Sequence, residues 1–404
     1  MAIGAKLKSL VGVALLSGAG GFVVAGTVEG GASAPEATAA EAALSLRDVP
    51  VLEEAFIDTA PADRDDGIEV GELGVDGGDR NSIVELAREI AAGEHGAIDS
   101  LLIAHHGKLV FESYYLRGRV NLPHPQASAT KAYTSLAIGR AIQLGHLTAA
   151  DLERPLIGFF EDLDRTRLVE GAESITLHKA MTMSSGLRIG EERMEELEKD
   201  AGRLEGWGEV QAYLEQSAPV TGESQSFNYQ GTDPRLVMQV LDAVVPGAAR
   251  DFIEKELLDE LGIAGHDWEE DASGLPAAGA GSSMTSRDMV KWGSLVRNKG
   301  RWGDLQLGPE EFIARATHRI LHLPDDEIFG GGELVSNCGY GYSWWQADMD
   351  VGGKTYFSTS AQGGGGQFII LIDELDLIVV ATGHEREVRT LQMTAERVLP
   401  AFIR

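Results

Sequence analysis

Ser128 and Lys131 have the residue types and spacing of a nucleophile and its base. They lie three residues apart at the start of a segment whose apolar residues recur at helical spacing, namely Leu136, Ala137, Ala141 and Ile142. Both side chains would therefore share one face of the first helical turn. A serine hydroxyl needs a neighbouring base to act as a nucleophile, and burial can lower the pKa of a lysine enough to make it that base. The pair predicts attack on a carbonyl, and an accidental Ser-x-x-Lys on a solvated helix is the alternative.

Tyr229 is a second group with possible chemistry. It lies in the sequence Phe-Asn-Tyr-Gln-Gly-Thr-Asp at 227–233, a loop that leads into a helix from Pro234. A tyrosine hydroxyl close to a serine and a lysine could carry the proton from the nucleophile to the leaving group. The alternative is a tyrosine that only packs within its loop.

A glycine-rich stretch at 360–367 is the third feature. It reads Ser-Ala-Gln-Gly-Gly-Gly-Gly-Gln and opens a predicted strand. Glycines at this place let the backbone approach a ligand and offer an N–H group to a developing oxyanion. A phosphate-binding loop would instead follow a strand and open a helix. The remaining alternative is a glycine-rich turn without a site.

The residues before Ser128 predict a helix and a hairpin. Ser82 and Glu85 have capping-box spacing for a helix that ends at Gly93. Strands at 101–104 and 109–111 flank a turn that needs glycine. A proline-containing loop at 122–126 then reaches Ser128, which places the nucleophile at the edge of a sheet.

The rest of the chain is predicted to be helical first and then extended. Helix starts are expected at 147–151 and at 285–293, and a further helix at 176–187 should end at Gly186. Four strands are expected at 342–346, 354–358, 367–372 and 377–382, the last two forming a hairpin. An amphipathic helix should close the chain at 386–403.

Strands near both ends, with helices between them, predict one sheet built from both termini and a mostly helical insertion. We expect a single domain at 81–404, with sheet parts at about 95–147 and 340–404 and a helical part at about 148–335. The active site should lie where the two parts meet.

The N-terminus has the layout of an export signal. Residues 1–34 carry lysines at 6 and 8, an apolar stretch from 10 to about 24, and Ala-Ser-Ala at 32–34. This pattern is typical of a secretory signal peptide, so we expect a periplasmic or secreted protein with no stable membrane insertion after cleavage. Residues 35–80 are acidic and should form an irregular extension.

The composition excludes several classes of partner and site. The formal charge of the 404 residues is −29, which disfavours nucleic acid and anionic membranes as partners. Cys338 is the only cysteine, so no internal disulfide can form and a buried apolar role is expected. His105 and His106 would point to opposite faces of a strand. We therefore expect no metal site and no cofactor.

Several ordered motifs together resemble the β-lactamase-related serine hydrolases, from about 97 to 385. The motifs are LLIAHHGKLVFESYY, SATK, ITLHKAMTMSSGL, FNYQGTD, GSSMTSRDMVKWGSLV and AQGGGGQFIILIDELDLIVV. The resemblance implies the α/β (α+β) fold of serine β-lactamases and transpeptidases, with helices flanking an antiparallel sheet. It also implies Ser128 as nucleophile, Lys131 as base and Tyr229 as proton shuttle, with the N–H groups of Ser128 and Gly364 holding the oxyanion.

Two departures from the β-lactamase pattern affect the expected substrate. Tyr229 is followed by Gln230 and Gly231 where similar β-lactamases carry Tyr-x-Asn, and 361–363 reads Ala-Gln-Gly where they carry Lys-Thr-Gly or a histidine variant. The pattern, with two tryptophans upstream at 344–345, is similar to 6-aminohexanoate-dimer hydrolases and related esterases. This resemblance implies that Gln362, Gly363 and Trp345 contact the substrate.

The leading hypothesis is an exported serine hydrolase that cleaves a small ester, an amide or a peptide-like substrate. The alternatives are a penicillin-binding DD-peptidase or weak β-lactamase, and a non-catalytic binding or sensing protein that has kept the fold. The sequence leaves the acyl group, the leaving group and the oligomeric state open.

Overall fold

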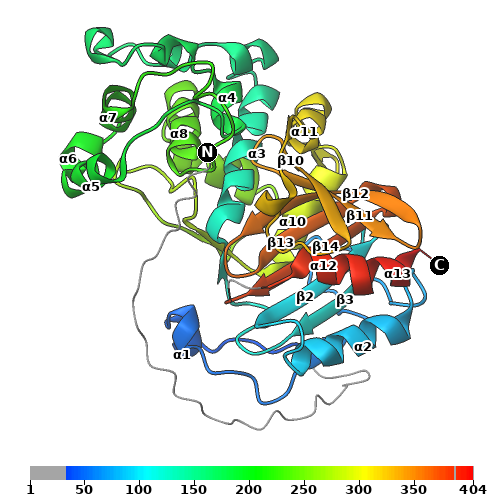
Figure 1. The fold of residues 1–404 in the computed structure, drawn as a ribbon. Coiled ribbons are helices and arrows are strands. Elements are labelled where there is room, and N and C mark those ends of the chain that lie inside the picture. Colours follow the sequence, from blue (N-terminus) through cyan, green and yellow to red (C-terminus); the bar gives the residue numbers. More distant parts are fainter. Residues whose placement is uncertain (1–32, 386–387, 404) are drawn as a thin grey trace.

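A nine-stranded antiparallel sheet forms the centre of the computed structural model, which describes residues 33–385 and 388–403 (Figure 1). The strand order is β1-β3-β2-β14-β13-β12-β11-β10-β9. The strands are β1 (Phe56–Asp58), β2 (Ile98–His105), β3 (Lys108–Tyr114), β9 (Leu321–His322), β10 (Val335–Tyr340), β11 (Trp345–Val351), β12 (Lys354–Gly363), β13 (Gln367–Ile372) and β14 (Leu377–Gly383). The predicted sheet from both ends of the chain is confirmed, since β2 pairs directly with β14.

Helices cover both faces of this sheet. One face carries α2 (Arg80–Ala91) and the C-terminal helix, which runs through α12 (Thr390–Met393), a π-helical turn (Thr394–Val398) and α13 (Leu399–Phe402). The other face carries α10 (Ser286–Arg297), beyond which lies α3 (Thr130–Gln143). Each sheet face therefore has its own apolar core, as expected when residues alternate along strands that are buried on both sides.

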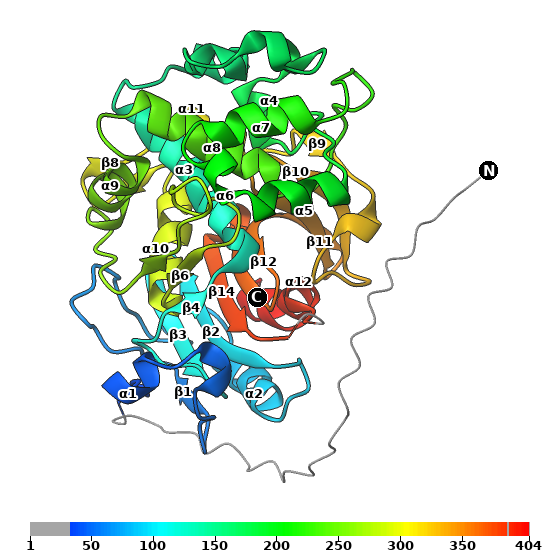
Figure 2. The same ribbon diagram turned by 90° about the vertical axis from the view of Figure 1, so that its left-hand side faces the viewer.

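The middle of the chain forms a mostly helical part beside the sheet (Figure 2). Its helices are α4 (Leu177–Met181), α5 (Glu191–Lys199), α6 (Ala201–Leu204), α7 (Gly208–Gln216), α8 (Thr232–Val244), α9 (Ala249–Ile253) and α11 (Glu310–Thr317). Two small sheets lie outside the large one: β4 (His124–Pro125), β6 (Ser282–Met284) and β5 (Asp267–Trp268) form a three-stranded sheet, and β7 (Arg301–Trp302) and β8 (Leu305–Gln306) form a local hairpin.

Most predicted elements are present, and their caps explain where they begin. The hairpin at β2–β3, the hairpin at β13–β14, the Thr285 cap and the Thr148 cap are confirmed. The capping box predicted at Ser82 is wrong. The helix begins at Arg80, because Asp79 caps it and accepts hydrogen bonds from both the backbone N–H and the hydroxyl of Ser82.

Two further elements differ from the sequence prediction. The helix expected at 176–187 ends at Met181, and Met183 adopts a left-handed backbone with φ 55° that no helix continues. The strand expected at 342–346 begins at Trp345, because Ser343 lies in a tight turn with φ 62° after β10, a strand that was not predicted.

The segment at 35–80 is more ordered than the predicted irregular extension. It contains α1 (Ala39–Ala42) and supplies the edge strand β1, which pairs with β3. Asp66 binds Arg287 on α10 with a shortest separation of 2.6 Å between Nε and Oδ2, so this segment is anchored to the core. The predicted signal peptide at 1–34 falls outside the described residues except for 33–34.

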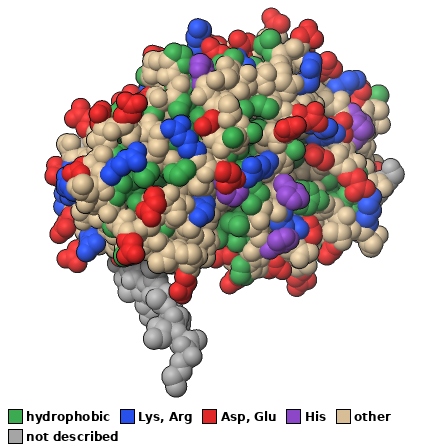
Figure 3. Space-filling view, turned by 90° about the horizontal axis from the view of Figure 1, so that it is seen from above, with side chains coloured by type: hydrophobic (Ala, Val, Ile, Leu, Met, Phe, Trp, Pro, Cys, Tyr) green, Lys and Arg blue, Asp and Glu red, His purple; other side chains and the backbone are tan. Residues whose placement is uncertain are grey.

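Acidic and basic side chains are intermingled on the face shown in Figure 3. Cys338 is buried, as predicted. In the parts of the chain that the structure describes, no helix is long and apolar enough to cross a membrane.

Candidate active site

Ser128 and Lys131 meet where the chain enters α3. Ser128 lies in a single 3-10 turn (Ala127–Ala129) that continues into the helix, and the Oγ of Ser128 is 3.0 Å from the Nζ of Lys131. Ala127, just before the nucleophile, has a left-handed backbone with φ 45°, a costly conformation for a residue with a Cβ. The turn therefore presents Ser128 at the N-terminal end of a buried helix.

The amine of Lys131 is buried against a distant loop. Lys131 is 5% exposed, and its Nζ donates a hydrogen bond of 2.7 Å to the carbonyl oxygen of Gly279. Burial lowers the pKa of Lys131 from 10.5 to about 8. Roughly a tenth of the amine would then be neutral at pH 7, which is the form that can accept a proton from Ser128.

Tyr229 completes the predicted group of three. It lies in the loop before α8, and the Nζ of Lys131 is 4.9 Å from the centroid of its ring. Burial of the hydroxyl end raises the pKa of Tyr229 although 39% of the residue surface is exposed, and a hydrogen bond with Ser128 opposes that rise. The structure thus brings together all three side chains predicted to be catalytic.

An aromatic cluster supports the ring of Tyr229. The centroid of Trp345 lies 5.4 Å from that of Tyr229, and Tyr340 and Phe227 lie 6.3 Å and 6.4 Å away. Trp345 is 8% exposed and Tyr340 is fully buried. Trp345 therefore packs against the tyrosine, and its predicted contact with substrate stays a prediction. Sequence reasoning missed Tyr340 and Phe227 in this role, although both are aromatic residues in quoted or neighbouring segments.

The end of β12 lies directly beside the nucleophile turn. A Cβ at Gly363 would come within 2.1 Å of the carbonyl oxygen of Gln126, so only glycine allows this approach. Gly363 pairs with Gln367 as the last residue of the strand, and the space around the Cβ position of Gly364 is open. Gly364 is the first residue beyond this contact and is exposed, and its predicted role in binding the oxyanion stays a prediction.

Gln362 precedes this contact and is buried. Its Nε2 donates to the Oγ of Ser360 at 2.8 Å, and its Oε1 has no hydrogen-bond partner among the described residues. Ala361 is fully buried. The one basic residue of β12, Lys354, is at the opposite end of the strand. The strand therefore carries a neutral amide near the site and no cation.

Buried hydrogen bonds hold the turn that carries Ser128. The Oε1 of Gln126 accepts from the hydroxyl of Tyr133 at 2.8 Å, and its Nε2 donates to the carbonyl oxygen of His124 at 2.8 Å. The hydroxyl of Thr130 contacts that of Ser282 at 2.8 Å, which ties α3 to the loop containing Gly279. Gln126 and Gly279 were not predicted as site residues. Gly279 acts through its backbone, so its side-chain type gives no chemical signal, although the quoted motif begins two residues later.

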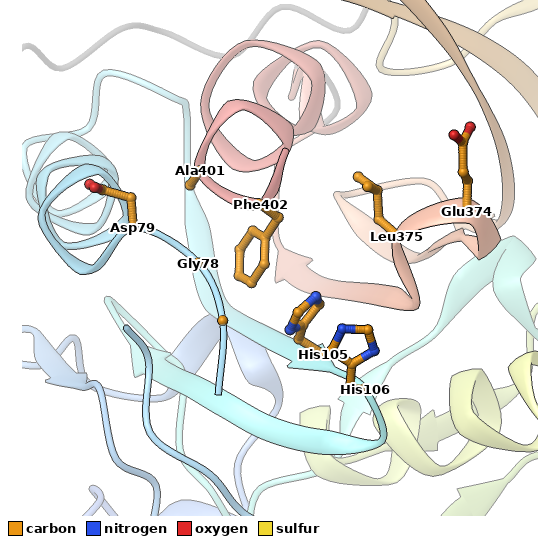
Figure 4. Close-up of a pocket in the computed structure, with 9 residues that line it drawn as sticks. Gly78, Asp79, His105, His106, Glu374, Leu375, Ala401 and Phe402 are labelled. Atoms are coloured by element: carbon orange, nitrogen blue, oxygen red, sulfur yellow. The ribbon is translucent and has the colours of Figure 1, made fainter. Parts of the chain in front are cut away.

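A pocket of about 440 Å³ lies at the other end of β13, away from Ser128 (Figure 4). His105 and His106 line it, and their ring centroids are 3.9 Å apart. The expectation that these rings point to opposite faces is wrong, because His106 has left-handed backbone with φ 50° in the β2–β3 turn. No three His, Cys, Asp or Glu side chains converge on a possible metal position within residues 33–385 and 388–403.

Comparisons with known proteins identify a matching family model and solved structures with a similar fold. A family model described as Beta-lactamase matches residues 85–395. The fold is similar to that of a Bacillus anthracis protein assigned as a 6-aminohexanoate-dimer hydrolase, with TM-score 0.56, 17% identity and coverage of 74% of this chain and 76% of that one. A comparison with curated proteins found no match.

Two further solved structures share the fold. The octameric penicillin-binding protein homologue from Pyrococcus abyssi has TM-score 0.58 and 18% identity, covering 79% of this chain and 77% of that one. A D-stereospecific amidohydrolase from a Streptomyces species has TM-score 0.58 and 15% identity, covering 80% of this chain and 98% of that one. Identities this low establish the common fold and leave the substrate to be argued from the site.

Proposed function

Because this chain belongs to the Beta-lactamase family, we propose that it is a serine hydrolase that cleaves an ester or an amide through an acyl-enzyme on Ser128. The observation that carries the proposal is the 3.0 Å separation between the Oγ of Ser128 and the Nζ of a buried Lys131, with Tyr229 beside both. A nucleophile, a base and a proton carrier in contact are the parts that acyl transfer requires.

The proposed reaction begins with proton transfer from Ser128 to the neutral amine of Lys131. The Oγ then bonds to the substrate carbonyl carbon, and the carbonyl oxygen takes the negative charge. Backbone N–H groups of Ser128 and Gly364 would stabilise this oxyanion, a contribution typically worth about 2.7–4 kcal/mol for one donor. Tyr229 passes a proton to the leaving alcohol or amine as the bond to the carbonyl carbon breaks, and the ammonium of Lys131 gives Tyr229 the proton that it took from Ser128. Water then attacks the acyl-enzyme, and the proton it loses restores the hydroxyl of Ser128.

The substrate class follows from which groups this site has and which it lacks. Gly231 replaces the asparagine, and Ala361 replaces the cation, with which similar β-lactamases meet the amide and the carboxylate of a β-lactam. A carboxylate placed near Gln362 would therefore lose a charge-assisted hydrogen bond. Neutral esters and linear amides fit this site better than β-lactams do. The likeness to a protein assigned as a 6-aminohexanoate-dimer hydrolase favours the same class.

Ester turnover tests the proposal. Ser128→Ala should lower turnover of p-nitrophenyl butyrate by several orders of magnitude, since the nucleophile is removed. Ser135→Ala is the matched control, because Ser135 lies on the same helix and its buried hydroxyl has no hydrogen-bond partner among the described residues. Full activity in Ser128→Ala would reject the proposal.

Two companion assays separate the alternatives. Stable labelling by a fluorescent penicillin, without ester turnover, would instead identify a penicillin-binding DD-peptidase. A protein that turns over no ester, amide or β-lactam and takes up no fluorophosphonate would be a binding protein with this fold. Export is proposed from the pattern at 1–34, and N-terminal sequencing of protein from a secreting host should find a start near residue 35.

A further inference from the structure

Asp233 is a fully buried carboxylate four residues after Tyr229, in the first turn of α8. Its oxygens accept hydrogen bonds from the hydroxyl of Ser185 at 2.6 Å, from the Nε2 of Gln230 at 2.7 Å and from the backbone N–H of Ser185 at 3.3 Å. No lysine, arginine or histidine of residues 33–385 and 388–403 forms an ion pair with it. A buried carboxylate without an ion pair is costly, so its retention calls for an explanation.

The two residues that flank Tyr229 are linked to this carboxylate. The Nδ2 of Asn228 donates to the Oε1 of Gln230 at 2.7 Å, and Gln230 in turn donates to Asp233. The backbone N–H of Asn228 also donates to the carbonyl oxygen of Met183 at 2.8 Å. The side chains on either side of Tyr229 are therefore hydrogen-bonded to each other, and this chain of hydrogen bonds ends at the carboxylate of Asp233. We call Asn228, Gln230 and Asp233 the clamp.

The charges around Asp233 come from three segments. Burial raises the pKa of Asp233 from 3.8 to about 6, and the hydrogen bonds from Ser185 and Gln230 and the positive charge of Arg188 oppose that rise. On β10, burial raises the pKa of Tyr340, and negative charge on Tyr229 and on Asp233 raises this pKa further. Tyr340 also packs against the ring of Tyr229. Asp233 therefore ionises close to the residues that support Tyr229, the proposed proton carrier.

We propose that Asp233 is a positioning residue for Tyr229, and that its ionised form is required for efficient acylation of Ser128. This inference rests on the proposed serine hydrolase function. The ionised carboxylate can accept all of the hydrogen bonds described above. Once protonated, the carboxyl group has one oxygen that must donate; the hydroxyl of Ser185 can accept this proton, whereas the N–H groups of Gln230 and Ser185 cannot. The neutral carboxyl is also a weaker acceptor for the hydrogen bond from Gln230.

The loss of charge on this acceptor changes how Tyr229 is held. A weaker hydrogen bond to Gln230 loosens one side of the clamp, and the phenol can move relative to Ser128. Misplacement of a reacting group by about 1 Å can cost about 100-fold in rate. The substrate does not touch Asp233 in this account, so the loss should fall on kcat and leave KM nearly unchanged.

The pH profile distinguishes this role from a merely structural one. The amine of Lys131 has to be neutral and the carboxylate of Asp233 has to be ionised, and both conditions fail as the pH falls. The logarithm of kcat/KM should therefore rise with slope two below about pH 6 and slope one between about 6 and 8. A carboxylate that only supports the fold would leave slope one throughout the range in which the protein stays folded.

Three variants test the inference, with p-nitrophenyl butyrate hydrolysis measured from pH 4.5 to 9. Asp233→Asn should lower kcat by about 10- to 100-fold at pH 8, change KM less than threefold, and show slope one down to pH 4.5. Gln230→Met keeps the carboxylate but cuts the clamp, and should lower kcat by a similar factor. Ser185→Ala leaves the clamp intact and should keep kcat at pH 8 within threefold, while moving the acid limb to higher pH.

Two results would overturn the inference. One is a slope of two that persists in Asp233→Asn, and the other is a Gln230→Met protein with the wild-type kcat. If Asp233→Asn does not fold, Gln230→Met and Ser185→Ala still decide the matter. Failure of the proposed function is separate, because it would appear as full activity in Ser128→Ala whatever the clamp variants do.

Discussion

The Nζ of Lys131 lies 3.0 Å from the Oγ of Ser128, within a single turn at the start of α3. The second contact of this amine, at 2.7 Å, is with the carbonyl oxygen of Gly279, which is 148 residues further along the chain. Local helix geometry therefore sets the distance between nucleophile and base. The distant loop buries the amine, and burial gives the lysine the pKa of a base.

Lys131→Met should abolish ester hydrolysis while leaving the protein folded. We expect kcat/KM to fall by about 10³-fold or more, because the base that accepts the proton of Ser128 is removed. At pH 7 the variant should be at least as stable as the wild type, since a buried ammonium is replaced by an apolar group of similar length. Activity assays and thermal melts of the two proteins measure both effects.

The pH dependence of stability checks the same lysine. The pKa of Lys131 is about 8 in the folded chain, against 10.5 for an ordinary lysine. Between these values the unfolded chain holds a proton that the folded chain does not, so wild-type stability should rise with pH in this window. The difference in the free energy of unfolding between Lys131→Met and the wild type should therefore become smaller as the pH rises from about 8 to about 10. Lys255→Met, at an exposed lysine, should show no such trend, and a constant gap for Lys131→Met would argue against the lowered pKa.

Gly363→Ala should damage the site where Gly364→Ala does not. The new methyl group at 363 would lie 2.1 Å from the carbonyl oxygen of Gln126, and either the strand or the nucleophile turn has to move. We expect kcat to fall at least tenfold, because a shift of this size displaces Ser128. The Cβ position at Gly364 is open, and alanine there keeps the backbone N–H. Equal activity of the two variants would show that this approach does not matter.

Arg287→Met should lower stability without touching the site. The guanidinium is 2.8 Å from the buried carboxylate of Glu112 and also binds Asp66. Burial already raises the pKa of Glu112, and Arg287 opposes that rise. Removing one partner of a buried ion pair typically costs about 3–5 kcal/mol, so the midpoint of urea unfolding should fall clearly.

The stability prediction has an exposed control. Arg154 is a half-exposed arginine 3.9 Å from Asp151, and Arg154→Met should change the free energy of unfolding by less than about 1 kcal/mol. If Arg287→Met were as stable as this control, the ion pairs of Arg287 would not anchor the N-terminal segment.

The sequence was sufficient where the relevant interactions are local. Ser128 and Lys131 are one helical turn apart, and the caps at Thr148 and Thr285 involve residues three positions away. Alternating and apolar runs also located β2, β3, β13 and β14. The motif order then connected Tyr229 to the pair, although composition alone favoured a tyrosine that is only packed in its loop.

The remaining features depend on distant contacts or on single backbone torsions. The carbonyl oxygen of Gly279 has no side-chain signal, and Asp233 accepts hydrogen bonds from Ser185, which lies in another segment. The close contact between the tilted rings of His105 and His106 follows from one left-handed residue, which strand alternation could not predict. The helix begins at Arg80, earlier than predicted, because Asp79 is its cap. The hydroxyl of Ser82 donates a hydrogen bond to Asp79 and so does not act as the cap.

Mass spectrometry of the protein after reaction with a fluorophosphonate tests the acyl-enzyme on Ser128 most directly. The account predicts one adduct per chain, located on the peptide that contains Ser128, and no adduct in Ser128→Ala. It also predicts much slower labelling in Lys131→Met, because the hydroxyl would no longer be activated. An unlabelled wild-type protein, or an adduct on another residue that persists in Ser128→Ala, would contradict it.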